Sequence, residues 1–430
     1  MGRVFLSVLG TGDYVECIYK FDGDFESVPT RYVQEATVSR YCKDWGPNDK
    51  IIIFTTSDAR DRNWNDHDYY DKIEKRSYQR EGLETRLKSL GILAQITNID
   101  IVEGKSVEEI WSIFQNIFDN LNEHDEIVFD ITHSFRSIPM LVLVVLNYAK
   151  VLKKVNLTGI YYGAFEVLGP PHQARTIPLD ERKAPIFDLT PFVELQDWST
   201  AIDRFLKAGD ASMAAELAKS SRGNLDITCA SDLAEKMLQF TTSLSTCRGK
   251  NLATCARELR AAIAACENSN MPPTALSHLL TLIQDNLESF PDDEIRSGVA
   301  ASRWCLDHNL IQQGITILQE TVISFLCELA GLDHRNSECR KIAKCAVVCR
   351  KKPEDEWKNE AAKNPEVTRI CIKAIQGSAQ LMGFLGKELP RLDSYRNDID
   401  HAGFTDQTHE PEKFKNALAK AIDAVSKIVQ

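Results

Sequence analysis

Two short stretches of the chain bring together side chains that can bind phosphate or move a proton. The first is residues 130–139 (DITHSFRSIP), where hydroxyl groups, the His133 imidazole and the Arg136 guanidinium follow one another closely. Apolar runs on both sides predict a buried strand, a polar turn and then a helix. A helix N-terminus points free N–H groups at such a turn, which suits it to phosphate binding. The alternative is a capped turn in which Arg136 makes a structural salt bridge.

The second stretch is residues 395–403 (YRNDIDHAG), near the C-terminal end. An imidazole such as that of His401 can transfer protons near neutral pH, and a guanidinium such as that of Arg396 can stabilise charge on a phosphate. Five residues on a helix correspond to about 140° and about 7.5 Å, so the two side chains do not share a narrow stripe. They can still reach a common groove at a helix end or at a dimer seam. A surface helix pair is the alternative interpretation.

The spacing of Arg and His in this stretch is not rare, because the chain repeats it at Arg62 and His67 and at Arg303 and His308. The residues between Arg303 and His308 are mostly apolar, which is typical of packing. The copy at Arg62 falls in the loop after the second expected strand. The setting of the last copy is different, with polar residues throughout and Pro390 and Asp393 as start signals for its helix.

The first 190 residues alternate strand and helix patterns. This alternation predicts a Rossmann-like α/β domain with a mainly parallel sheet, in which ligands bind beyond the carboxyl ends of the strands. A further strand-like segment at residues 14–21 is expected to form a hairpin arm. The expected strands are residues 4–9, 51–55, 94–102, 126–131 and 157–162, and the expected helices are residues 32–41, 78–90, 107–121 and 138–152.

Three of these strands end in glycine or polar residues, which we expect to share one edge of the sheet. The sequences are GTGD at residues 10–13, TTSD at 55–58 and DITH at 130–133. Glycine allows a close approach between backbone and ligand. Val15 stands where a dinucleotide-binding fingerprint would need a third glycine, which argues against a nicotinamide-dependent dehydrogenase.

Beyond about residue 191 only helical periodicity is found, which predicts all-α domains. We expect a helical linker domain at residues 191–300 and a second helical domain at residues 301–430, with breaks near residues 268–273 and 290–293. The cluster of Arg and Lys between residues 335 and 352 is either a solvated helix face or a patch that faces RNA.

Composition excludes several classes of protein. The net charge of −11 argues against a protein that coats DNA, and no stable DNA binding is expected. No apolar run approaches the roughly 20 residues of a membrane span, and a signal peptide is not expected, so a cytoplasmic location is expected. The twelve cysteines form no CxxC pair, which favours small buried apolar side chains over disulfides or zinc ligands.

Together, the two stretches resemble those of a known family. Residues 9–14 (LGTGDY) and 130–139 resemble a CARF domain (CRISPR-associated Rossmann fold), and residues 396–401 (RNDIDH) look like the R-x4-6-H motif of HEPN ribonucleases. The whole order resembles the CARF–HEPN ribonucleases that accompany type III CRISPR systems. One departure is Ser134, where the family usually has glycine.

The resemblance implies that an allosteric activator, a cyclic oligoadenylate with cyclic tetra-adenylate as the expected ring, binds the CARF domain. No cofactor and no metal are expected. A symmetric ring suits a homodimer, or a higher oligomer, that presents the same pocket twice. The residues that the resemblance and the strand ends assign to this pocket are Gly10, Thr11, Gly12, Asp13, Ser57, Asp58, Thr132, His133, Ser134 and Arg136.

The resemblance also implies metal-independent cleavage of single-stranded RNA in antiviral defence. The 2′-hydroxyl of the substrate attacks the neighbouring phosphate, and the products carry a 2′,3′-cyclic phosphate and a 5′-hydroxyl. His401 would transfer protons, Arg396 would stabilise the phosphorane, and Asn397 would orient the phosphate or anchor the helix. Three alternatives stay open: a non-catalytic sensor of cyclic oligonucleotides, a ring nuclease that degrades its own ligand in the first domain, and a nucleotide-binding metabolic enzyme.

Overall fold

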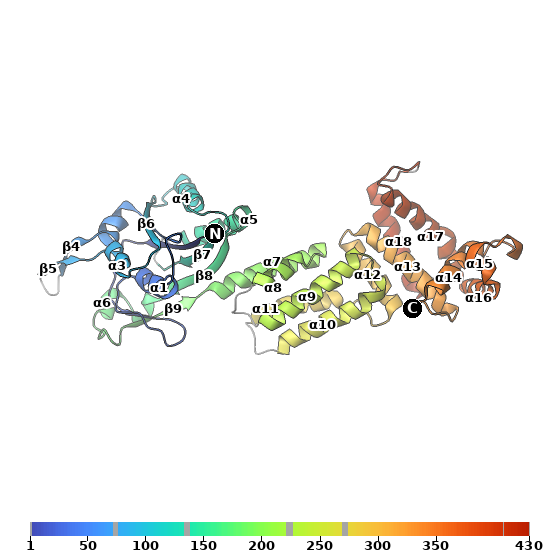
Figure 1. The fold of residues 1–430 in the computed structure, drawn as a ribbon, viewed down its shortest axis with the longest axis horizontal. Coiled ribbons are helices and arrows are strands. Elements are labelled where there is room, and N and C mark those ends of the chain that lie inside the picture. Colours follow the sequence, from blue (N-terminus) through green and yellow to red (C-terminus); the bar gives the residue numbers. More distant parts are fainter. Residues whose placement is uncertain are drawn as a thin grey trace. The chain divides into compact units, whose positions relative to one another are not determined.

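The computed structural model describes residues 2–71, 76–132, 138–220, 227–268, 274–406 and 408–429. The chain divides into two compact units, Met1–Val193 and Glu194–Gln430 (Figure 1). We describe the first as the α/β unit and the second as the helical unit. No helix in the described residues is both long and apolar enough to cross a membrane.

The α/β unit is built on a seven-stranded sheet with the order β2-β9-β8-β7-β1-β3-β6. Neighbouring strands are parallel except for β8 and β9, so the predicted mainly parallel sheet is confirmed. The strands are β1 (Arg3–Leu9), β2 (Ile18–Lys20), β3 (Lys50–Thr55), β6 (Gln95–Asp100), β7 (Glu126–Asp130), β8 (Asn156–Gly163) and β9 (Lys183–Asp188).

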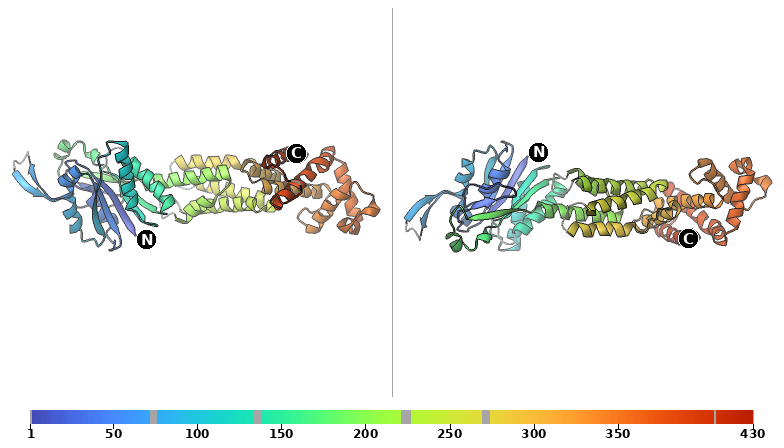
Figure 2. Two further views of the ribbon diagram at one scale, coloured as in Figure 1. Left: turned by 90° about the horizontal axis from the view of Figure 1, so that it is seen from above. Right: turned by 90° about the horizontal axis from the view of Figure 1, so that it is seen from below.

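Helices cover both faces of this sheet (Figure 2). Alternate side chains of β1 point to opposite faces, as the two-residue period of a strand requires. Phe5 packs in one apolar cluster with α1 (Val33–Tyr41) and α3 (Leu83–Ser89). Leu6 packs in the other with α4 (Val107–Asp119) and α5 (Ile138–Leu152). The sheet is therefore buried on both sides, and its ligand-accessible positions lie at its edges.

The segment at residues 14–21 lies antiparallel to the residues that follow it, with bridges from Cys17 to Thr30 and from Lys20 to Glu26, as the predicted hairpin arm requires. Within it, β2 also pairs in parallel with β9. Two other features of this unit differ from the sequence predictions. The helix expected at residues 78–90 begins only at Leu83, because β5 (Arg76–Arg80) pairs with β4 (His67–Asp71) in a separate antiparallel ribbon. Strand β9 was not predicted at all, since its short run mixes proline and charged residues with two buried apolar side chains.

In the helical unit, the predicted all-α character is confirmed, since no strand occurs among its described residues. Figure 2 shows the green and yellow helices running side by side. The helices, the first of which starts within the α/β unit, are α7 (Thr190–Ala208), α8 (Ser212–Ser220), α9 (Ile227–Ser245), α10 (Leu252–Asn268), α11 (Thr274–Leu287), α12 (Glu294–Asp307), α13 (Ile311–Leu329), α14 (Ser337–Cys349), α15 (Asn359–Lys363), α16 (Pro365–Gln376), α17 (Ala379–Asp400) and α18 (Pro411–Ile428).

Two apolar clusters fill this unit. The first cluster is formed by side chains of α7 to α13, and the second by side chains of α12 to α18. Helices α12 and α13 contribute to both clusters, through residues such as Ile317 in the first and Leu318 in the second. The predicted boundary at residue 300 would run through α12, and the division into a linker domain and a catalytic domain stays a prediction.

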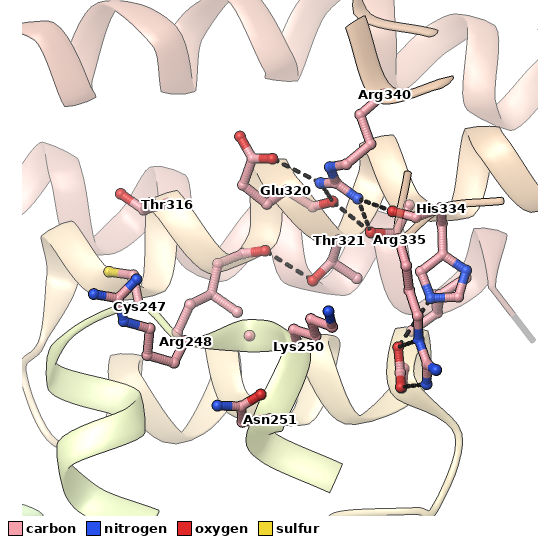
Figure 3. Close-up of a pocket in the computed structure, with 15 residues that line it drawn as sticks. Cys247, Arg248, Lys250, Asn251, Thr316, Glu320, Thr321, His334, Arg335 and Arg340 are labelled. Carbon is pink, nitrogen blue, oxygen red and sulfur yellow. Dashed lines mark hydrogen bonds and ion pairs between the residues drawn. The ribbon is translucent and has the colours of Figure 1, made fainter. Parts of the chain in front are cut away.

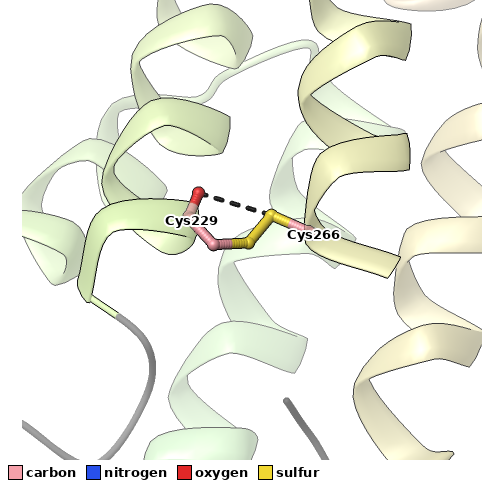
Figure 4. The surroundings of a disulfide bond; sticks show 2 residues. All are labelled: Cys229 and Cys266. Carbon is pink, nitrogen blue, oxygen red and sulfur yellow. Dashed lines mark hydrogen bonds between the residues drawn. A yellow bond between two sulfur atoms is a disulfide. The ribbon is translucent and has the colours of Figure 1, made fainter. Parts of the chain in front are cut away.

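The cysteines include one pair that the sequence analysis did not expect. Cys229 and Cys266 form a disulfide between α9 and α10, with their Cα atoms 5.4 Å apart (Figure 4). The prediction that none of the cysteines forms a disulfide is therefore wrong at this pair. Six of the ten free cysteines, among them Cys17, Cys305 and Cys371, are buried, as expected for small apolar side chains.

Candidate functional sites

The carboxyl ends of β7, β1 and β3 lie next to one another, because these parallel strands are neighbours in the sheet. The segments that follow them, residues 10–13, 56–58 and 131–132, therefore share one edge. This is the arrangement that the sequence predicts for a ligand site. His133, Ser134 and Arg136 lie outside the described residues, so their assignment to this site stays a prediction.

The glycine loop after β1 is held in shape from within the protein. The Gly10 N–H donates to the Tyr14 hydroxyl at 3.0 Å, and the Asn63 amide donates to the Gly10 and Gly12 carbonyls at 2.8 and 3.0 Å. A Cβ on Gly10 or Gly12 would approach the Tyr14 side chain to 2.9 or 3.0 Å. These glycines thus make room for Tyr14, and Thr11 between them is exposed.

Asp13 is the centre of an ion-pair cluster. Its carboxylate lies 2.8 Å from an Arg80 nitrogen and 2.6 Å from an Arg175 nitrogen. Arg80 also donates to the Tyr14 carbonyl at 2.8 Å and lies over the Tyr69 ring. Burial raises the pKa of Asp13, but the two guanidinium groups outweigh it and lower the pKa overall. The sequence analysis missed both arginines, because nothing local links them to residue 13.

The turn after β7 is anchored by a buried carboxylate. The Thr132 hydroxyl and N–H donate to Asp130 at 2.6 and 3.0 Å, and the Ser7 hydroxyl donates to Asp130 at 3.2 Å. Thr132 in turn accepts a hydrogen bond from the Gly163 N–H at 2.8 Å. Asp130 is only 1% exposed, and its burial raises the pKa to about 6 despite these hydrogen bonds. Asp130 therefore ties the ends of β1, β7 and β8 together.

Two separate hollows adjoin this edge of the sheet. Thr132 lines a hollow of about 460 Å³ together with Tyr162 and Glu166. Ser57 lines a smaller hollow of about 220 Å³ with Asp100 and other residues. Asp58, next to Ser57, is exposed. The larger hollow is the size of a small-molecule site, so Thr132 is the described residue best placed to contact a ligand there.

The second candidate site lies at the end of α17, which begins earlier than the sequence analysis expected. Ser378 caps the helix by accepting a hydrogen bond from the Leu381 N–H at 3.2 Å, so Pro390 lies inside the helix and is not its start. The helix ends at Asp400 and is followed by Ala402 and Gly403, both with positive φ. Positive φ cannot continue a right-handed helix, so His401 stands at the C-terminal cap.

Polar side chains of α13 hold Arg396 at this helix end. Arg396 donates to the Gln319 amide oxygen at 2.8 Å, and the Gln319 amide nitrogen donates to Asp393 at 2.7 Å. The Arg396 guanidinium also lies 3.8 Å from Asp400. Burial raises the pKa of Asp393, although Arg396 and Gln319 act in the opposite direction. Arg396 is thus fixed at one end while a substantial part of its side chain stays accessible.

His401 and Asn397 are exposed at the same end of α17. The His401 N–H donates to the Asn397 carbonyl at 3.1 Å, which continues the helical hydrogen bonding by one residue. Their side chains are therefore open to a substrate or to a second subunit.

A histidine that the sequence analysis did not single out fixes the segment after His401. His409 donates from its backbone N–H to Asp398 at 2.8 Å, and its ring nitrogen Nδ1 lies 3.0 Å from the same carboxylate. The ring packs edge-on against Tyr395, with centroids 4.6 Å apart. Burial raises the pKa of Asp398, but the hydrogen bonds from His409 lower it overall. Eleven residues separate the pair, so no helical periodicity could have indicated it.

His308 and the basic cluster have structural roles. His308 stacks on Trp304, and its ring nitrogen Nε2 lies 2.9 Å from the Leu206 carbonyl, which confirms the packing interpretation. Within the basic cluster, Arg340 and Lys344 both pair with Glu320. Much of its charge is thus neutralised inside the chain, which favours the helix-face interpretation over an RNA-facing patch.

The α/β unit, with mainly parallel strands covered on both faces and polar loops at the strand ends, has a Rossmann-like architecture. Residues 4–166 match the family described as the CARF domain of the CRISPR system endoribonuclease Csx1. Most of the α/β unit is therefore similar to the CARF domain of Csx1.

A relative extends the similarity into the helical unit. The chain is 24% identical over 383 residues to the CRISPR-associated protein MJ1674 of Methanocaldococcus jannaschii. The match covers 79% of this chain and 57% of that protein, so the chain spans little more than half the length of this relative.

Proposed function

We propose that the chain is a cyclic oligoadenylate-activated endoribonuclease that cleaves single-stranded RNA in type III CRISPR antiviral defence. The observation that carries this proposal is the pairing of a domain similar to the Csx1 CARF domain with a partly exposed Arg396 and an exposed His401 at one helix end of the helical unit. The first would sense the activator, expected to be cyclic tetra-adenylate, and the second would cut RNA without a metal ion.

The edge of the sheet supports the sensing role. Phosphate groups would contact the Thr11 hydroxyl and the turn at Thr132. Arg136 follows this turn in the sequence, and Arg175 lies close to the glycine loop through its ion pair with Asp13. Arg175 is already within 2.6 Å of Asp13, so an incoming phosphate would compete with this carboxylate for the guanidinium. Such competition gives the activator a way to loosen one set of contacts when it binds, which is what an allosteric ligand requires.

An exposed apolar surface on α4 and α5 supports a homodimer. Exposed apolar patches of this kind mark interaction sites, and this one begins directly after the segment assigned to the ligand. Phe114 joins the two helices, since its ring lies 5.4 Å from that of Trp111 and 5.6 Å from that of Tyr148. A second copy would thus bring a second pocket beside the first and match a symmetric ring. The exposed apolar side chains of this surface are Val107, Trp111, Met140, Leu143, Val144, Tyr148, Val151 and Leu152.

The chemistry at α17 follows from two side chains. His401 would remove the proton from the 2′-hydroxyl, whose oxygen then attacks the adjacent phosphorus and expels the 5′-oxygen. Arg396 would stabilise the negative charge of the phosphorane. The leaving oxygen also needs a proton, and each chain offers one histidine at this site. His401 of a second subunit would meet that need, and the products would carry a 2′,3′-cyclic phosphate and a 5′-hydroxyl.

The test is cleavage of labelled single-stranded RNA by the purified full chain in EDTA, with and without cyclic tetra-adenylate and cyclic hexa-adenylate. We expect cleavage only with one of the rings, and products that resist 3′-end ligation until the cyclic phosphate is opened and the resulting monophosphate is removed. Equal rates with and without rings would refute the activation. Ring binding without cleavage would favour a non-catalytic sensor, and consumption of the ring by the α/β unit would favour a ring nuclease.

A further inference from the structure

The helical unit contains a cavity that neither candidate site uses. It has a volume of about 430 Å³ and lies among the short turn Gly249–Asn251, the start of α12, one face of α13 and the segment before α14 (Figure 3). Its volume falls in the range of small-molecule sites. Four Arg or Lys side chains line it against two Glu side chains, so the cavity is locally positive in a chain of net charge −11.

Both carboxylates of the cavity already have cationic partners. Glu320 pairs with Arg340 at 2.6 Å, and Lys344 approaches it at 2.7 Å. Glu294 pairs with His334 at 2.9 Å and also with Arg335. The guanidinium and imidazole groups lower the pKa of Glu294 despite its burial, so it is held as an anion. These pairs leave little acceptor capacity for a cationic ligand.

Two hydroxyl groups of the cavity are also engaged as donors. The Thr321 hydroxyl donates to the Ile317 carbonyl at 2.7 Å, and the Ser324 hydroxyl donates to the Glu320 carbonyl at 3.0 Å. In contrast, the exposed side chains of Arg248 and Lys250 have no ion pair or hydrogen bond with any described residue. The donors still available to a ligand thus include these two cations and the amide of exposed Asn251, which all belong to one short turn.

An apolar wall faces these cations. Ile295 and Ile317 line the cavity from α12 and α13, with only 4% and 2% of their surfaces exposed. A ligand that fits must combine an anionic, acceptor-rich group with a flat or apolar part. A nucleoside phosphate has both, since its phosphate accepts charge-assisted hydrogen bonds and its base can cover apolar surface.

We propose that this cavity binds a nucleoside phosphate, with the phosphate at Arg248 and Lys250 and the base against Ile295 and Ile317. The ligand is either a free nucleotide or one nucleotide of an RNA strand. The site is separate from the sheet edge and from Arg396, and it does not depend on the proposed ribonuclease activity. It shares α13 with the contacts of Arg396, because Gln319 precedes Glu320 in that helix.

The experiment is calorimetric titration of the full chain with AMP, with adenosine, with inorganic phosphate and with a 2′-O-methyl oligonucleotide that cannot be cleaved. We expect saturable AMP binding that is roughly tenfold tighter than adenosine binding, since two charge-assisted hydrogen bonds are worth at least that factor. Tight binding of the oligonucleotide but not of AMP would identify the strand as the source.

The double variant Arg248→Glu/Lys250→Glu assigns the binding to this cavity. We expect it to lose one binding site or to weaken it by roughly tenfold or more, while Arg248→Lys/Lys250→Arg keeps most of the affinity. The matched control is Lys219→Glu/Arg257→Glu, which makes the same charge change at two exposed positions of the helical unit. Equal binding by the two Glu variants, or no saturable binding of any phosphate-bearing probe, would overturn the proposal.

Discussion

The two candidate sites differ in how they are held. At the edge of the sheet, residues from β1, β7, β8 and distant loops hold one another through the buried Ser7–Asp130 hydrogen bond, the Gly163–Thr132 hydrogen bond and the exposed Asp13–Arg175 ion pair. At the end of α17, a single helix presents Arg396, Asn397 and His401, and only Arg396 is braced from behind. The first candidate site is a preorganised surface that depends on many residues, whereas the second depends on few and would gain a second His401 only from another subunit.

Replacing His401 with Ala is expected to have the largest effect. Removal of a group that transfers protons in the transition state costs roughly 10²–10⁴-fold in rate, with little effect on activator binding. The measurement is the initial rate of RNA cleavage with saturating activator. His278→Ala, at another exposed histidine of the helical unit, should leave the rate unchanged. Full activity of His401→Ala would remove the catalytic role of this helix end.

Asp130 makes the stability of the α/β unit depend on pH. Its pKa is raised by burial from 3.8 to about 6, so the folded state holds the proton more tightly than the unfolded state. Stability from this group is fully present below about pH 4 and is lost as the pH rises through about 6, by about 3 kcal/mol at most. Urea unfolding of the wild type and of Asp130→Asn from pH 4 to 7 should show this difference.

The Thr132 hydroxyl, which donates a hydrogen bond to Asp130, allows a second test of this pH dependence. Thr132→Val removes the hydroxyl that lies 2.6 Å from the carboxylate, which should raise the pKa further and move the loss of stability to higher pH. A difference between wild type and Asp130→Asn that does not change with pH would contradict the role of a buried, titrating carboxylate.

His409 offers the corresponding test at the helical site. His409→Ala removes the ring that contacts Asp398 and Tyr395, so the segment after His401 should lose its anchor. We expect the melting temperature to fall by a few degrees and RNA cleavage to fall more than activator binding. His172→Ala, at an exposed position of the α/β unit, is the control. Unchanged cleavage with a lowered melting temperature would limit His409 to a structural role.

The comparison also separates what the sequence could predict from what it could not. The buried strands and the amphipathic helices were predicted, because continuous apolar runs and a 3.6-residue period are local signals. The β4–β5 ribbon and β9 were not, because their short, polar-rich sequences become strands only through pairing with a partner.

The candidate sites also contain contacts that the sequence could not predict, because they join residues far apart in the chain. The motif residues could be chosen from local patterns, and the structure places Gly10 and Thr132 at neighbouring strand ends as expected. Arg175 meets Asp13 across 162 residues, and Gln319 meets Arg396 across 77. No local sequence pattern predicts these two contacts, so they can be identified only in the folded structure.

The smallest expected effect concerns Tyr14. It tests whether the glycine loop already has its binding conformation in the free protein or adopts it when a ligand binds. Tyr14→Phe removes the hydroxyl that accepts from the Gly10 N–H at 3.0 Å. Loss of this hydrogen bond should cost about 1 kcal/mol of stability and weaken activator binding a few-fold, because the loop loses part of its shape. Chemical unfolding and titration with cyclic tetra-adenylate measure the two effects. Tighter binding by the variant would mean instead that the Tyr14 hydroxyl competes with a ligand phosphate for the Gly10 N–H, so that the sheet-edge site opens on binding and is less preorganised than its hydrogen bonds indicate.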